Sequence, residues 1–186
     1  MSIGRDWMKA RTQVKVLVVD DEPVMRRLII GMLRNIPVLD VEIAEAGDGA
    51  AALQHLRGGP ENKPDLIITD LRMEPLGGLP FIRTVRSGEY GIDRFLPMVA
   101  MTSDTETDTV TRVLRAGADG LVPKPVSQEM LRRQVLQVLT RESPFIEIVL
   151  PEGKYFGPFS PFVKQNVLVP GCPHRIVHKR QGRIAA

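Results

Sequence analysis

Short apolar runs alternate along most of the chain with longer stretches in which apolar residues recur at helical spacing. The first run, residues 14–19, is too short for a typical helix and too uniformly apolar for a strand with one face in water, so it indicates a buried parallel strand. From Met25 to Leu33, apolar residues recur at intervals of three and four, the spacing of one helical face.

The same alternation continues to about residue 140. Four further strands are predicted at 41–44, 66–69, 97–101 and 120–122, and four further helices at 50–56, 79–85, 110–117 and 131–139. Five strand–helix units in succession predict an α/β fold, a doubly wound five-stranded parallel sheet with helices on both faces. The flavodoxin-like strand order 2-1-3-4-5 suits this length, and ligands bind such sheets beyond the carboxyl ends of the strands.

Polar residues follow four of the predicted strands at their carboxyl ends. Asp20 and Asp21 follow the first strand, Asp70 the third, Thr102 the fourth and Lys124 the fifth. Crowded carboxylates would repel one another, which predicts a cation between them, and oxygen-only ligands favour Mg²⁺. A carboxylate can attack a phosphoryl group, and an ammonium and a hydroxyl can stabilise the phosphoryl oxygens. A lone aspartate at such a position would more often be a helix N-cap, so the prediction rests on the whole set.

The order and spacing of these residues resemble the response regulator receiver family. The matching motifs are Asp20-Asp21, Asp70, Thr102 and Lys124-Pro125, and the stretches 70–73, 77–79 and 117–120 resemble the family too. The resemblance covers about residues 14–140, which we expect to form the receiver domain, with 141–186 as a C-terminal extension.

The resemblance implies a role for each site residue. Asp70 would be the phosphate acceptor. A histidine kinase or histidine phosphotransferase would supply the phosphoryl group. Mg²⁺ would be bound by Asp70 and Asp21, with Asp20 beside them and the backbone carbonyl of Arg72 as a further ligand. Thr102 and Lys124 would contact the phosphoryl group, and the peptide bond before Pro125 would be cis.

Two features depart from the usual form of the family or add to it. Leu121 stands where receivers usually carry a tyrosine or phenylalanine that moves on phosphorylation, so Leu121 either alters the switch or simply packs in the last strand. Arg72 and Asp104 follow the acceptor and Thr102 by two residues each, which places them at the rim of the site. They could shield an acyl phosphate from water and slow its hydrolysis, or they could be two solvated charges.

The C-terminal extension differs in composition from the rest of the chain. It holds six prolines, four glycines and five of the nine aromatic residues, so we expect an irregular arm, with one strand at 145–150. It carries seven Lys or Arg against three Glu, and therefore accounts for the net charge of +3. The aromatics could anchor the arm on its own receiver, on a second copy or on a partner. Alternatively, the basic run 174–180 could touch nucleic acid.

These features predict a response regulator that signals through protein contacts, without a separate effector domain and without turnover of a metabolite. Two alternatives remain open: a transcriptional regulator that binds DNA through its basic tail, and a scaffold independent of phosphorylation. A third class, hydrolases of the haloacid-dehalogenase type, is disfavoured, because such an enzyme needs an aspartate where Arg72 stands. No signal peptide or membrane span is visible, so we expect a cytoplasmic protein. The sequence predicts neither the downstream partner nor whether the chain pairs with a second copy.

Overall fold

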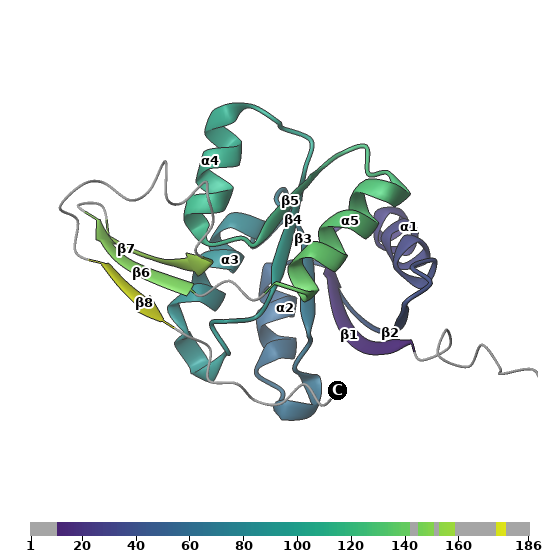
Figure 1. The fold of residues 1–186 in the computed structure, drawn as a ribbon, viewed down its shortest axis with the longest axis horizontal. Coiled ribbons are helices and arrows are strands. Elements are labelled where there is room, and N and C mark those ends of the chain that lie inside the picture. Colours follow the sequence, from purple (N-terminus) through teal and green to yellow (C-terminus); the bar gives the residue numbers. More distant parts are fainter. Residues whose placement is uncertain (1–10, 142–144, 151–152, 159–173, 178–186) are drawn as a thin grey trace, which may run out of the picture.

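The computed structural model describes residues 11–141, 145–150, 153–158 and 174–177, and a parallel sheet forms its centre (Figure 1). The strands are β1 (Thr12–Val19), β2 (Leu39–Ala46), β3 (Leu66–Asp70), β4 (Met98–Thr102) and β5 (Gly120–Pro123). They pair in the order β2-β1-β3-β4-β5, and every pair is parallel. The flavodoxin-like order predicted from the sequence is therefore confirmed.

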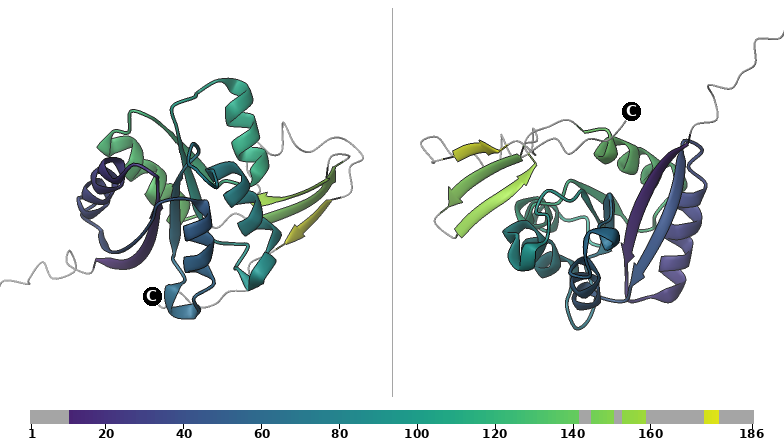
Figure 2. Two further views of the ribbon diagram at one scale, coloured as in Figure 1. Left: turned by 180° about the vertical axis from the view of Figure 1, so that it is seen from behind. Right: turned by 90° about the horizontal axis from the view of Figure 1, so that it is seen from below.

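Helices cover both faces of this sheet, in two layers. They are α1 (Pro23–Arg34), α2 (Gly49–Leu56), α3 (Gly78–Ser87), α4 (Thr107–Ala116) and α5 (Gln128–Leu139), with short 3₁₀ turns η2 (Pro60–Asn62) and η3 (Glu89–Gly91). Helices α1 and α5 lie on one face of the sheet, and α2, α3 and α4 lie on the other (Figures 1 and 2). Among the described residues, no helix is long and apolar enough to span a membrane.

Strand β1 shows why its sequence is apolar at successive positions. Val16 and Val18 pack into the core under α1 and α5, whereas Leu17 and Val19 pack with Phe81 in the core under α2, α3 and α4. Side chains of a strand alternate between faces, so a strand with a core on both sides must be apolar throughout. All five of these side chains are at most 1% exposed.

Local capping fixes where several helices begin and end. Asp48 accepts hydrogen bonds from the amides of Ala50 and Ala51 at the start of α2, and Ser127 accepts one from Met130 at the start of α5. Helix α4 ends at Gly117, whose φ of +100° lies in the left-handed region that favours glycine.

The C-terminal extension forms a second, antiparallel sheet. Its strands are β6 (Phe145–Leu150), β7 (Gly153–Pro158) and β8 (His174–Val177), in the order β7-β6-β8. The predicted strand at 145–150 is confirmed, whereas β7 and β8 were not predicted. The sheet lies beside α3 and α4, on the opposite side of the molecule from α1 (Figures 1 and 2). The rest of the predicted basic run, from residue 178 onward, lies outside the described residues.

Candidate functional site

Four strand ends bring the predicted site residues to one edge of the sheet. Asp20 follows β1 directly, Asp70 ends β3, Thr102 ends β4, and Lys124 follows β5. Because the strands are parallel and adjacent, their carboxyl ends share this edge. The topology thus places together residues that are up to 104 positions apart in the sequence.

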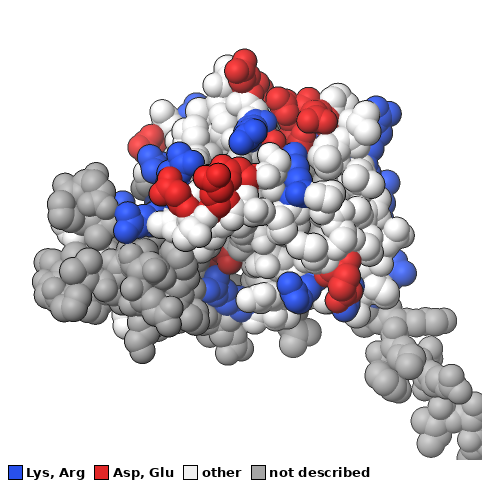
Figure 3. Space-filling model, turned by 90° about the horizontal axis from the view of Figure 1, so that it is seen from above, with Lys and Arg blue, Asp and Glu red and all other residues white. Residues whose placement is uncertain are grey.

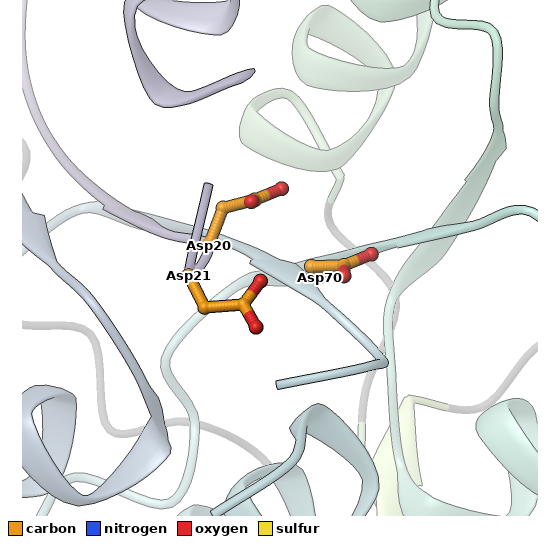
Figure 4. Close-up of side chains that lie close together, drawn as sticks. All are labelled: Asp20, Asp21 and Asp70. Carbon is orange, nitrogen blue, oxygen red and sulfur yellow. The ribbon is translucent and has the colours of Figure 1, made fainter. Parts of the chain in front are cut away.

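Three carboxylates form the centre of the site. Asp20, Asp21 and Asp70 each offer a carboxylate oxygen within 4.8 Å of the others, and their side chains gather at the strand ends in Figure 4. Asp20 is fully buried and Asp70 is 5% exposed, whereas Asp21 is exposed. The amide of Glu22 donates to Asp20 Oδ1 at 2.9 Å, and the Arg26 guanidinium donates to the Asp20 carbonyl at 2.7 Å. These two hydrogen bonds hold Asp20 in place.

Lys124 supplies the positive charge of the site. Its Nζ lies 2.9 Å from Asp70 Oδ1 and 3.2 Å from Asp20 Oδ2, and its side chain is only 15% exposed. Burial alone would lower the pKa of this amine, but the hydrogen bonds and charges of the two aspartates outweigh burial and raise the pKa. Lys124 is therefore a fixed cation beside the two carboxylates.

Burial dominates the ionisation of Asp70. Loss of solvent raises the pKa of the Asp70 carboxyl above the ordinary value for aspartate, and the hydrogen bond from Lys124 only partly offsets this rise. The neighbouring charge of Asp20 raises the pKa further. Asp70 is thus a poorly solvated carboxylate that lies beside the ammonium of Lys124.

The connection after β3 folds closely around Asp70. The amide of Arg72 donates to Asp70 Oδ2 at 3.3 Å, and the amide of Gly78 donates to the Leu71 carbonyl at 3.0 Å. A Cβ atom at position 78 would collide with the carbonyl oxygen of Asp70, so this turn requires a glycine. The motif with two successive glycines thereby brings the start of α3 against Asp70.

Thr102 and Asp104 connect the site to α4. Thr102 Oγ1 accepts from the amide of Asp104 and donates to its carbonyl, both at 3.0 Å. The Asp104 carboxylate accepts from Thr109 Oγ1 at 2.7 Å and from the amide of Glu106 at 3.0 Å. These two hydrogen bonds, with a contribution from the charge of Arg72, lower the pKa of Asp104. Asp104 therefore organises the start of α4, a role that the sequence did not reveal.

Two further predicted positions, Leu121 and Pro125, lie in β5 and just after it. The peptide bond between Lys124 and Pro125 is cis, as expected. Leu121 is half-buried and packs against the core under α2, α3 and α4. The face above the strand ends carries acidic and basic side chains close together (Figure 3).

A buried ion pair between Arg86 and Asp119 lies at the other end of the sheet, and it was not predicted from the sequence. Arg86 in α3 donates to Asp119 at 2.7 Å, to the Gly117 carbonyl at 2.8 Å, and to the carbonyls of Arg94 and Leu96. Arg86 is 3% exposed. Asp119 lies 33 residues away from Arg86 in the sequence, so no local sequence pattern could predict that the two residues pair.

Together, the sheet order and the strand-end residues define a site where a buried carboxylate faces a lysine and two further carboxylates. The model of the response regulator receiver domain matches residues 16–136. The chain therefore belongs to the response regulator receiver family.

Individual relatives agree with this assignment. The chemotaxis protein CheY of Pseudomonas aeruginosa is 32% identical over 128 residues, which cover 69% of this chain and 98% of that protein. The CheY4 structure of Vibrio cholerae has a TM-score of 0.59 at 28% identity, covering 68% of this chain and 99% of that one. The receiver domain of the sensor histidine kinase PA1611 of Pseudomonas aeruginosa, with magnesium in its active-site cleft, has a TM-score of 0.59 at 25% identity, covering 70% of this chain and all of that one.

Proposed function

We propose that the chain is a two-component response regulator that accepts a phosphoryl group on Asp70 from a phosphohistidine of a histidine kinase or phosphotransferase. A carboxylate oxygen of Asp70 attacks the phosphorus and forms a P–O bond, while the P–N bond to the donor imidazole breaks. The imidazole nitrogen keeps the electron pair and takes up a proton from water. The product is an acyl phosphate on Asp70.

The contact between Lys124 Nζ and Asp70 Oδ1, at 2.9 Å, carries this proposal. It places a fixed cation beside the carboxylate that becomes bonded to phosphorus, where charge on the phosphoryl oxygens needs stabilisation. Thr102, at the end of the neighbouring strand, supplies a hydroxyl to a phosphoryl oxygen. Burial of Asp70 limits access of water to the acyl phosphate.

The donor set suits Mg²⁺. Three carboxylates against one ammonium leave two negative charges uncompensated, which equals the charge of one divalent cation. Asp20, Asp21 and Asp70 would hold the ion, with the Arg72 carbonyl as a further oxygen ligand. When bound, Mg²⁺ supplies positive charge to the phosphoryl oxygens.

Metal binding gives a direct test of this part of the proposal. Isothermal titration of the full chain with Mg²⁺ should show one site, and Asp21→Asn should weaken it at least tenfold, since one of three anionic ligands is lost. Asp40→Asn, an exposed substitution in β2, serves as the matched control and should leave binding unchanged. Equal affinity in wild type and Asp21→Asn would exclude this ligand set.

Output is proposed to run through protein contacts and not through DNA, and the chain is proposed to turn over no separate substrate. In the described part of the basic run, Arg175 pairs with Glu147 at 3.3 Å, so that charge is already engaged within the arm. Binding of the full chain to duplex DNA that weakens steeply with salt would contradict this assignment.

A further inference from the structure

The second sheet packs its aromatic side chains against the receiver domain. Phe145 in β6 and Phe156 in β7 both contact Phe95, with ring centroids 5.1 and 5.3 Å apart, and they stack on each other at 5.3 Å. Phe145 is 8% exposed and Phe156 is 5% exposed. Burial of these two aromatic rings stabilises the contact between the second sheet and the receiver domain. We call this sheet (β6, β7 and β8) the docked arm.

Cationic side chains of the receiver add to this contact. The Arg94 guanidinium lies 3.4 Å from the centre of the Phe156 ring, and it also approaches Glu147 of the arm at 3.9 Å. The Arg86 guanidinium lies 5.3 Å from the centre of the Phe145 ring. The docking surface thus combines an apolar centre with charges on both sides of the contact.

The arm also touches the carboxyl end of α4 through backbone atoms. A Cβ atom at position 117 would lie 2.6 Å from the Phe156 carbonyl oxygen, and one at position 157 would lie 3.0 Å from the Gly117 Cα. Two glycines therefore allow α4 and β7 to meet at backbone distance. Such a contact cannot absorb movement of α4 toward the arm by a change of side-chain rotamer.

The amino end of the same helix is tied to the phosphoryl site. Asp104 accepts from Thr109 in the first turn of α4, and its backbone engages the Thr102 hydroxyl in both directions at 3.0 Å. A hydroxyl has a single proton to donate. If Thr102 donates to a phosphoryl oxygen on Asp70, it can no longer donate to the Asp104 carbonyl.

We propose that α4 couples phosphorylation of Asp70 to release of the docked arm. The inference rests on the proposed function, because it needs a phosphoryl group to compete for the Thr102 hydroxyl. Loss of the Thr102–Asp104 bond shifts α4, and the shift breaks its backbone contact with β7. Phosphorylation then exposes the aromatic face of the arm and the α3–α4 surface that the arm covers.

Hydrogen exchange on the full chain tests this coupling. The protein is treated with acetyl phosphate and Mg²⁺, and intact mass establishes how much of it carries the adduct. Exchange in peptides covering β6 and β7 should rise at least fivefold in the phosphorylated protein, together with exchange in the first turn of α4. Unchanged exchange in β6 and β7 on fully phosphorylated protein would overturn the inference and leave the proposed function intact. Absence of an adduct would contradict the proposed function, and the inference with it.

Reciprocity provides a second, equilibrium test. If the phosphoryl state weakens docking, then weakened docking must favour the phosphoryl state by the same factor. Phe156→Ala should therefore bind beryllium fluoride with Mg²⁺, a non-covalent analogue of the phosphoryl group, about fivefold more tightly than wild type in isothermal titration. The control Ile176→Ala removes an apolar side chain that is 51% exposed in β8 and should bind as wild type does. Equal affinity in all three proteins would refute the coupling.

Discussion

Lys124 holds two carboxylates at once, and this dual contact distinguishes it from a surface lysine. Its amine lies within 3.2 Å of both Asp70 and Asp20, and neither of these residues is more than 5% exposed. Taking such charges out of water is costly unless they are paired. The site therefore holds the Lys124 ammonium close to the Asp70 carboxylate.

The raised pKa of Asp70 means that its carboxyl loses its charge at a higher pH than an ordinary aspartate does. Only the ionised carboxylate attacks phosphorus, and burial favours the protonated form. In the metal-free protein, NMR titration of the Asp70 carboxyl carbon should therefore give a midpoint above that of an ordinary aspartate.

Substitution of Lys124 should show both of its effects. Lys124→Met removes the hydrogen bond and the charge that lower the pKa of Asp70, so the titration of Asp70 in the metal-free protein should move to still higher pH. The rate at neutral pH should drop roughly 100-fold, as for loss of one group that stabilises developing charge. Lys15→Met, a change in β1 at a side chain that is 44% exposed, is the control. A variant with an unshifted pH profile would show that Lys124 does not act on Asp70.

We expect Arg72 to affect the lifetime of the acyl phosphate proposed on Asp70. Its backbone amide donates to Asp70 Oδ2 at 3.3 Å, so Arg72 lies directly beside the site. We expect Arg72→Ala to shorten the phosphate lifetime a few-fold, measured as decay of the adduct by intact mass after removal of acetyl phosphate. Arg83→Ala, in an exposed position on α3, should decay as wild type does. An unaltered lifetime in Arg72→Ala would leave Arg72 without a shielding role.

At the scale of elements, α3 depends on a single buried cation. Arg86 joins α3 to Asp119, Gly117 and the segment before β4 through four hydrogen bonds. Three of these bonds go to backbone carbonyls and the fourth to a carboxylate, so Arg86 fixes how α3, α4 and β5 meet. The docked arm lies over this junction, since the Phe145 ring covers Arg86.

Removal of the Arg86 guanidinium should strongly destabilise the fold. Arg86→Met leaves the Asp119 carboxylate buried without its main counter-charge, and we expect a loss of about 3–5 kcal/mol in the free energy of unfolding. Urea denaturation of wild type and variant measures the loss. Arg83→Met, an exposed change on the same helix, should stay within about 0.5 kcal/mol of wild type. A loss as small as that in Arg86→Met would show that the buried pair contributes little.

At the scale of the whole molecule, the sequence predicted those parts whose signal is local. The β1 run of valines and leucines indicated a strand buried on both faces, and the strand-end positions of Asp20, Asp70, Thr102 and Lys124 followed from chain order alone. Parallel strands convert such order into proximity, which is why the candidate site could be assembled from the sequence.

The parts that were missed depend on distant pairing. Strand β7 contains two glycines and a proline, a composition that disfavours a strand, and it forms because β6 supplies its hydrogen-bond partners. Strand β8 joins from the far end of the extension. The link from Asp104 to Thr109 and the docking of Phe156 on Arg94 likewise involve side-chain geometry that no periodicity encodes.

Phosphorylation of the full chain by acetyl phosphate and Mg²⁺, read by intact mass, tests the central claim most directly. We predict that the wild-type protein gains the mass of one phosphoryl group, that chelation of Mg²⁺ prevents the gain, and that Asp70→Asn, which removes the nucleophilic oxygen, shows none. A phosphoryl adduct of equal extent on Asp70→Asn, or no adduct on a wild-type protein that binds Mg²⁺, would contradict the assignment of Asp70 as the acceptor.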